Sequence, residues 1–108
     1  MSAAAVPDIR LNHDVNVFLK KHNANAAFEK VIALVRECYP NRQDMSFRLL
    51  DDPDTEDRQW LVIDVVLPES APLELIQRQD DAYHRRLVTE VSLEYCPLFA
   101  VTSHWAAE

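Results

Sequence analysis

The sequence predicts an α+β fold, a two-layer sandwich with two or three helices packed on one face of a small, mainly antiparallel sheet of about three to four strands. The main observation is a change of apolar period along the chain. Residues 24–39 and 71–92 show helical spacing, whereas residues 45–50 and 60–67 alternate as strands do. With 108 residues and 48% hydrophobic composition, the chain is long enough for one such core.

Residues 9–22 are ambiguous between helix and strand. Val15, Val17 and Leu19 alternate like a strand, but the apolar residues other than Val17 also share one helical face. A helix is favoured because Asn12 is a suitable N-cap. If this segment is a strand instead, the order of elements becomes the ferredoxin-like βαββαβ. In either case we expect a flexible tail at 1–7 and a single domain at 8–108.

Residues 24–39 contain the clearest helical pattern. Asn23 is suited to cap the helix, and Pro40 ends it because proline lacks an N–H and restricts the residue before it. The expected buried stripe consists of Ala24, Phe28, Val31, Ile32, Val35 and Tyr39.

Two half-buried strands are expected next, at 45–50 and 60–67, joined by a loop of about nine residues. Their core faces are predicted to be Met45, Phe47 and Leu49 in the first and Leu61, Ile63, Val65 and Leu67 in the second.

The other face of the second strand is unusually apolar for a solvent face, so we expect something to cover it. It consists of Trp60, Val62, Asp64 and Val66. Asp64 is an acid within an apolar strand, and Arg48 on the neighbouring strand is expected to form an ion pair with it.

Residues 71–92 predict a long helix with Ser70 as its cap and Pro72 in its first turn. A third strand, 98–102, is expected after Cys96-Pro97. The predicted core stripe of the helix consists of Leu73, Ile76, Leu87 and Val91, with Tyr83 at its edge.

Asp80 and His84 fall near the centre of this stripe, one helical turn apart. Buried polar groups are costly unless paired, and an imidazole can donate to a carboxylate four residues before it. Such a pair could orient a general base or supply two metal ligands, which makes Asp80 and His84 the candidate catalytic residues.

Residues 51–57 contain five acids and no base, so they carry −5 of the net charge of −7. Asp52, Asp54 and Glu56 alternate like the ligands in the first half of a calcium-binding EF-hand loop and are the candidate metal ligands. The match then fails, because the sixth position lacks glycine and the twelfth lacks glutamate. The pattern therefore favours a solvated turn, in which Asp52-Pro53-Asp54 supplies the turn chemistry.

Composition excludes several classes of function. The chain has no glycine, which excludes the phosphate loop, the dinucleotide fingerprint and the nucleophile elbow, so we expect no cofactor. No basic run exceeds two residues, and nucleic-acid binding is disfavoured. No apolar run is long enough for a membrane span, and we expect no secretory signal, because the first residues lack a basic stretch followed by a long apolar one. The two cysteines fit a reduced, cytoplasmic protein.

These observations favour a small acidic intracellular protein that acts in protein–protein interaction or as an accessory domain, an antitoxin-like or immunity-like role included. We expect a protein partner or self-association, such as a homodimer. The alternative is a small enzyme or metal-dependent protein using Asp80 and His84. The expected interaction residues are Trp60, Val62, Asp64, Asp54 and Asp57.

Overall fold

A computed structural model describes residues 12–55 and 58–106, and the predicted tail at 1–7 lies outside these residues. The described chain has the predicted α+β architecture, with a third strand that extends beyond the expected 98–102. None of the helices within these residues is long and apolar enough to cross a bilayer. The elements are α1 (His13–Lys21), α2 (Asn25–Cys38), β1 (Asp44–Asp51), β2 (Gln59–Leu67), α3 (Leu73–Glu90), the short 3-10 helix η2 (Cys96–Leu98) and β3 (Phe99–Trp105).

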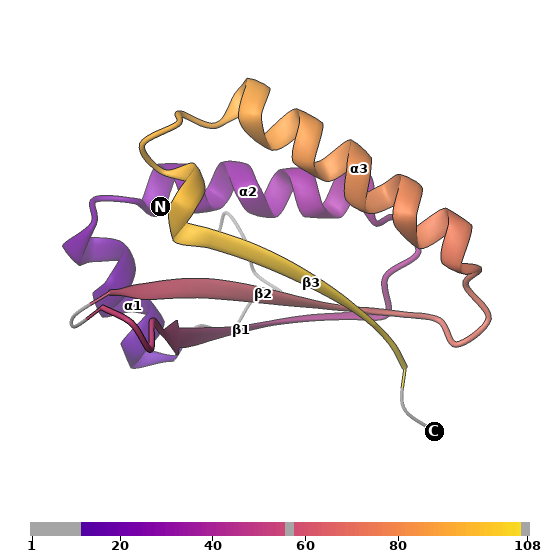
Figure 1. The fold of residues 1–108 in the computed structure, drawn as a ribbon, viewed down its shortest axis with the longest axis horizontal. Helices are drawn as coiled ribbons and strands as arrows, with labels where there is room; N and C mark the ends of the chain where they lie inside the picture. Colours follow the sequence, from indigo (N-terminus) through magenta and orange to yellow (C-terminus); the bar gives the residue numbers. More distant parts are fainter. Residues whose placement is uncertain (1–11, 56–57, 107–108) are drawn as a thin grey trace, which may run out of the picture.

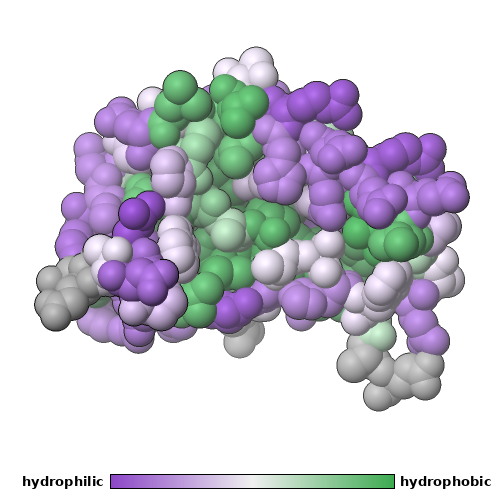
Figure 2. All heavy atoms as spheres, in the orientation of Figure 1, coloured by the Kyte–Doolittle hydropathy of each residue, from purple (hydrophilic) through white to green (hydrophobic). Residues whose placement is uncertain are grey.

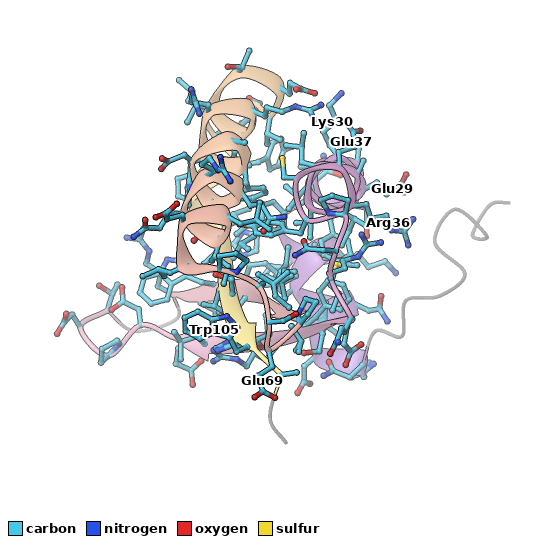
Figure 3. The ribbon with its side chains drawn as sticks, turned by 90° about the vertical axis from the view of Figure 1, so that its right-hand side faces the viewer. Glu29, Lys30, Arg36, Glu37, Glu69 and Trp105 are labelled. Atoms are coloured by element: carbon cyan, nitrogen blue, oxygen red, sulfur yellow. The ribbon has the colours of Figure 1, made fainter. Side chains whose placement is uncertain are left out.

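The helices and the sheet form two layers. Helices α2 and α3 lie side by side over one face of the sheet, while α1 lies beside β1 near the end of the β1–β2 hairpin (Figure 1). Figure 3 shows the same two layers from the side, with α2 and α3 above the strands. In the described part of the chain, no helix covers the opposite face of the sheet.

The sheet is mixed, with the strand order β1-β2-β3. Strands β1 and β2 pair antiparallel, with Phe47 opposite Ile63, but β3 runs parallel to β2, with Val101 opposite Ile63. The prediction of a mainly antiparallel sheet is therefore wrong for the pairing of β2 with β3. The reason is that α3 crosses over the sheet and returns the chain to the end where β2 began. Because residues 13–21 are helical, the described chain does not have the ferredoxin-like order.

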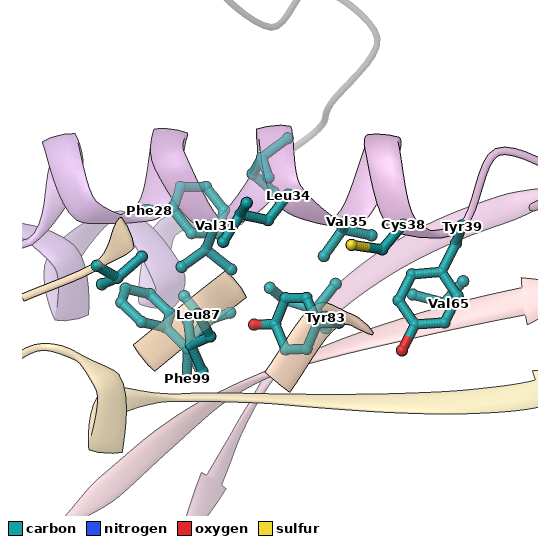
Figure 4. Close-up of a cluster of buried hydrophobic side chains, with 14 of the residues drawn as sticks. Phe28, Val31, Leu34, Val35, Cys38, Tyr39, Val65, Tyr83, Leu87 and Phe99 are labelled. Carbon is teal, nitrogen blue, oxygen red and sulfur yellow. The ribbon is translucent and has the colours of Figure 1, made fainter. Parts of the chain in front are cut away.

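The core fills the space between the two helices and the sheet (Figure 4). The ring of Phe28 on α2 lies 5.3 Å from that of Phe47 on β1 and 6.1 Å from that of Phe99 on β3, so one side chain joins three elements. The predicted stripe of α2 and the predicted core face of β2 are confirmed. Their buried residues are Ala24, Phe28, Val31, Ile32, Val35, Tyr39, Leu61, Ile63, Val65 and Leu67.

The connection between α1 and α2 shows how the chain turns without glycine. Asn12 caps α1 as expected, since its Oδ1 accepts a hydrogen bond from the Val15 N–H at 2.9 Å. Asn23, however, is not the cap of α2; Ala24 occupies that position without a side-chain hydrogen bond. Asn23 instead adopts a left-handed backbone with φ of 53°. Asparagine tolerates this conformation better than most other residues, and the chain has no glycine to supply it.

We expect Asn23→Ala to lower the free energy of unfolding by about 1–2 kcal/mol, because alanine gains nothing that offsets the strain of a left-handed backbone. Asn23→Gly should be neutral or stabilising, because glycine adopts the left-handed conformation without strain. Urea unfolding followed by circular dichroism measures both changes. Asn25→Ala, at an exposed helical position two residues away, is the control and should lose no stability. Equal losses for Asn23→Ala and Asn23→Gly would contradict this role of the backbone.

Two details of α3 also differ from prediction. Ser70 does not cap the helix; Pro72 is the N-cap residue, without a side-chain hydrogen bond. Leu73 is 55% exposed rather than buried. The buried face passes through Tyr83, so His84, which follows it by about 100° around the helix, points away from the core. That buried face consists of Ile76, Gln79, Tyr83 and Leu87.

Candidate functional site

A group of four polar side chains occupies the middle of the sheet face opposite α2 and α3. The carboxylate of Asp64 on β2 accepts hydrogen bonds from Arg48 Nε at 2.9 Å and from Thr102 Oγ1 at 2.6 Å. His104 Nε2 lies 3.2 Å from the same carboxylate and 3.0 Å from Thr102 Oγ1. We call Arg48, Asp64, Thr102 and His104 the Asp64 cluster. It ties all three strands together on this face.

The register of the strands explains the cluster. Asp64 stands directly between Ser46 on β1 and Thr102 on β3. Arg48 lies two residues beyond Ser46 and reaches Asp64 diagonally, which the length of its side chain allows. The predicted ion pair between Arg48 and Asp64 is therefore confirmed. Thr102 and His104 were missed because the sequence does not show which strand lies beside β2.

The electrostatics of Asp64 follow from these partners. Its side chain is only 16% exposed. Burial alone would raise the pKa of the carboxyl, but hydrogen bonds from Arg48, Thr102 and His104 together hold that pKa below its usual value. The group is therefore an anion at neutral pH whose charge is already satisfied within the protein.

We expect Asp64→Asn to cost about 1–2 kcal/mol of stability at pH 7, since the hydrogen bonds to a charged acceptor become weaker. A pKa lowered by folding adds stability above the unfolded-state value near 3.8, and this contribution is lost as the pH falls through that value and below it. Urea unfolding between pH 7 and pH 3 should therefore show the difference between wild type and variant shrinking toward pH 3. A difference that stays constant with pH would contradict a charged Asp64 in the folded state.

Apolar side chains surround the Asp64 cluster. Leu50 is 44% exposed, Trp60 and Val66 are half-buried, and Ala100 is exposed. We call these four residues together with the Asp64 cluster the open sheet face. The predicted interaction residues Trp60 and Asp64 belong to it. Val62 lies on the same face but is only 2% exposed, so it supports these side chains more than it offers contact area.

The acidic tip, residues 51–57 of the sequence, begins where the β1–β2 ladder ends. The Asp52 carboxylate accepts a hydrogen bond from the Asp54 N–H at 2.9 Å, and the Asp52 N–H donates to the Arg58 carbonyl at 2.9 Å. The predicted turn chemistry of Asp52 and Asp54 is therefore confirmed. Arg58 Nε also lies 3.9 Å from the Asp52 carboxylate, and the Arg58 guanidinium lies 6.0 Å from the ring centre of Trp60.

The metal prediction at the acidic tip stays a prediction. Glu56, one of its three candidate ligands, and Asp57, an expected interaction residue, lie outside the described residues. Among residues 12–55 and 58–106, no three histidine, cysteine or acidic side chains are grouped so that they could hold a metal ion.

Asp80 and His84 do not form the side-chain pair that the sequence suggested. The half-buried carboxylate of Asp80 accepts a hydrogen bond from the hydroxyl of Tyr39, the residue that follows α2, and lies 3.4 Å from Ser103 Oγ of β3. His84 is exposed, and its Nδ1 lies 2.8 Å from the backbone carbonyl oxygen of Asp80. The imidazole and the carboxylate therefore have separate partners, and the enzyme hypothesis loses the contact on which it was based.

The contact between Tyr39 and Asp80 is suited to a structural task. Burial, together with the hydrogen bond to Asp80, raises the pKa of the Tyr39 phenol well above its usual value. The hydroxyl therefore stays protonated and donates to the carboxylate. Since Ser103 Oγ contacts the same carboxylate, Asp80 on α3 is joined to the C-terminal end of α2 and to β3.

Two adjacent hollows open beside α1, of about 590 Å³ and about 360 Å³, and His13 and Val17 line both. Neither is lined by Asp80, His84 or a residue of the Asp64 cluster. The larger one mixes opposite charges, with Lys21 beside Asp14 and Asp51. This mixture gives no preference for one sign of ligand.

Comparison with models of known protein families, with curated proteins and with solved structures finds no match for this chain.

Proposed function

We propose that this protein is a protein–protein interaction or accessory domain that docks a basic partner on its open sheet face, beside the acidic tip. The observation that carries the proposal is the uneven covering of the sheet. In the described chain α2 and α3 cover one face, while the other presents apolar side chains around a central polar cluster. A small sheet of this kind normally buries an apolar face against another layer.

The Asp64 cluster suits burial in an interface. Arg48, Thr102 and His104 already satisfy the Asp64 carboxylate, so covering the face does not strand an unpaired charge. Leu50, Trp60 and Val66 offer the apolar area that the centre of an interface requires. A partner can therefore gain contact with the apolar side chains without breaking hydrogen bonds that the free protein already makes.

The acidic tip supports a basic partner. It continues directly from the open sheet face, because Leu50 pairs with Trp60 and Asp51 with Gln59 at the end of the ladder. Five acids among residues 51–57 attract a positively charged surface before contact and raise the association rate. Cys38 and Cys96 are free thiols, which fits a reducing, cytoplasmic setting. An antitoxin-like or immunity-like protein is one form that such a role takes.

The proposal is tested by purifying tagged protein from cells that make it naturally and quantifying the proteins that accompany it. We expect at least one specific partner with the wild type, and at least a tenfold loss with Leu50→Lys, since a lysine there removes apolar contact and repels a basic surface. Ala33→Lys is the control. Ala33 on α2 is exposed, lies in the other layer of the fold, and receives the same charge change.

Equal recovery of the partner with Leu50→Lys and wild type would contradict docking on the open sheet face. Equal loss with Leu50→Lys and Ala33→Lys would contradict it as well, because a general effect of added charge then explains the result. Raising the salt concentration should weaken the complex in the wild type, since steering by the acidic tip is screened.

A further inference from the structure

Strand β3 forms an edge of the sheet, and among the described residues no other strand pairs with its outer side. Its sequence, FAVTSHW, contains no lysine, arginine, aspartate, glutamate or proline. Natural edge strands usually carry such residues, since they prevent pairing with another chain. The opposite edge, β1, does carry them, with Asp44, Arg48 and Asp51, and α1 lies beside it.

We propose that β3 binds β3 of a second copy of this chain, antiparallel about a two-fold axis that passes through Thr102. The two three-stranded sheets then join into one of six strands. Edge pairing of this kind takes its affinity from main-chain hydrogen bonds and its register from the side chains. It is a separate contact from the docking of a basic partner proposed above.

The seven residues of β3 fit a two-fold register. With Thr102 on the axis, each large side chain meets a small or complementary one across the new ladder, and Thr102 meets itself, a favourable cross-strand pair. The two residues of each pair stand equally far from Thr102, one before it and one after it, as an isologous contact requires. The pairs are Phe99 with Trp105, Ala100 with His104, and Val101 with Ser103.

The ends of β3 add apolar contact that only the antiparallel arrangement uses. In the connection that leads from α3 to β3, Leu93 is 72% exposed. Near its end, Trp105 is half-exposed and its Nε1 donates to the Ala71 carbonyl at 2.9 Å, which places it beside the segment that leads into α3. A two-fold axis through Thr102 brings the start of one strand to the end of the other. Figure 2 shows hydrophobic side chains along this side of the molecule, between the hydrophilic surface of α3 and a polar lower rim.

The charge distribution also permits this dimer. Residues 51–55 of the acidic tip lie near the start of β3, because Phe99 pairs with Leu61, two residues after β2 begins. Antiparallel pairing therefore sends the two tips to opposite ends of the joined sheet. A strand of seven residues spans about 23 Å, well beyond the Debye length of about 8 Å at physiological salt. Repulsion between the tips is then screened.

The proposal is tested first by sedimentation equilibrium of the purified chain. We expect a mass of twice the 12.5 kDa of one chain. Thr102→Cys, made with Cys96→Ser to remove the other accessible thiol, should then form a disulfide-linked dimer on mild oxidation, because residues opposite each other have Cβ atoms about 5 Å apart. Ser46→Cys in the same background is the control, since Ser46 is exposed on the other edge strand.

A chain that stays monomeric at all concentrations up to about 100 μM would overturn the proposal, because nearly all stable dimers have a dissociation constant below that value. A dimer that links through Ser46→Cys as efficiently as through Thr102→Cys would overturn it too, because pairing at β3 brings only the Thr102 positions together. If Thr102→Cys disturbs the Asp64 cluster, Val101→Cys combined with Ser103→Cys gives the same test at the adjacent pair of the register, outside that cluster.

Discussion

Replacing Asp80 with alanine should lower the free energy of unfolding by about 1–3 kcal/mol, because it leaves the buried Tyr39 hydroxyl without its acceptor. The loss should be larger than for any exposed acid on α3, such as Asp81. Urea unfolding at pH 7 measures both variants. If Asp80 served a reaction rather than the fold, its removal would leave stability unchanged.

A double substitution distinguishes the loss of the Tyr39–Asp80 hydrogen bond from other effects of removing Asp80. Tyr39→Phe should cost about 1 kcal/mol alone, and Tyr39→Phe with Asp80→Ala should cost less than the sum of the single changes, since both remove the same hydrogen bond. Tyr83→Phe is the matched control. The Tyr83 hydroxyl is buried and has no hydrogen-bond partner among the described residues, so its removal should be neutral or stabilising. Additive losses would contradict the contact between Tyr39 and Asp80.

Two consecutive valines of β2 should respond very differently to the same change. Val65 is fully buried under the helices, and Val65→Ala should cost about 2–3 kcal/mol through lost burial and the cavity that remains. Val66 is half-buried on the open sheet face, and Val66→Ala should cost less than about 1 kcal/mol. Thermal and urea unfolding of the two variants checks the difference.

In binding to the partner, Val66→Ala should have the larger effect and Val65→Ala the smaller one. Val66→Ala removes apolar area from the proposed docking surface, so it should weaken recovery of the partner while leaving the fold intact. Val65→Ala should destabilise the protein without a specific effect on binding at temperatures where the variant stays folded. Similar stability losses for both valines would indicate that the open sheet face is covered as firmly as the core.

Local patterns predicted much of this fold because their signals lie within single elements. The helical stripe that contains Phe28 and the alternation around Ile63 both reflect which side chains face the core, and the structure confirms them. Asn23 was misassigned, since good N-cap residues also tolerate the left-handed conformation and sequence alone does not separate the two uses. The stripe predicted for α3 is confirmed at Ile76, Tyr83, Leu87 and Val91. It was wrong at the exposed Leu73, and it missed Gln79, a polar residue that the apolar pattern could not mark as buried.

The candidate site was only partly predictable for a related reason. Arg48 and Asp64 lie on strands adjacent in sequence, so their ion pair follows from alternation and proximity. Thr102 joins them through a parallel pairing with β2, across 38 residues of chain. Tyr39 reaches Asp80 across 41 residues. Such contacts depend on how α3 returns the chain to the sheet, and no local period of the sequence carries that information.

Docking of a partner on the open sheet face is tested most directly by a photo-crosslinking amino acid placed at Leu50, in cells that make the protein naturally. Position 50 is exposed, so the substitution need not disturb the core. We predict that irradiation links one predominant basic protein at position 50 and leaves only background at position 33, which is exposed on α2 in the other layer. The same background at both positions, or the same products from both, would contradict the docking surface.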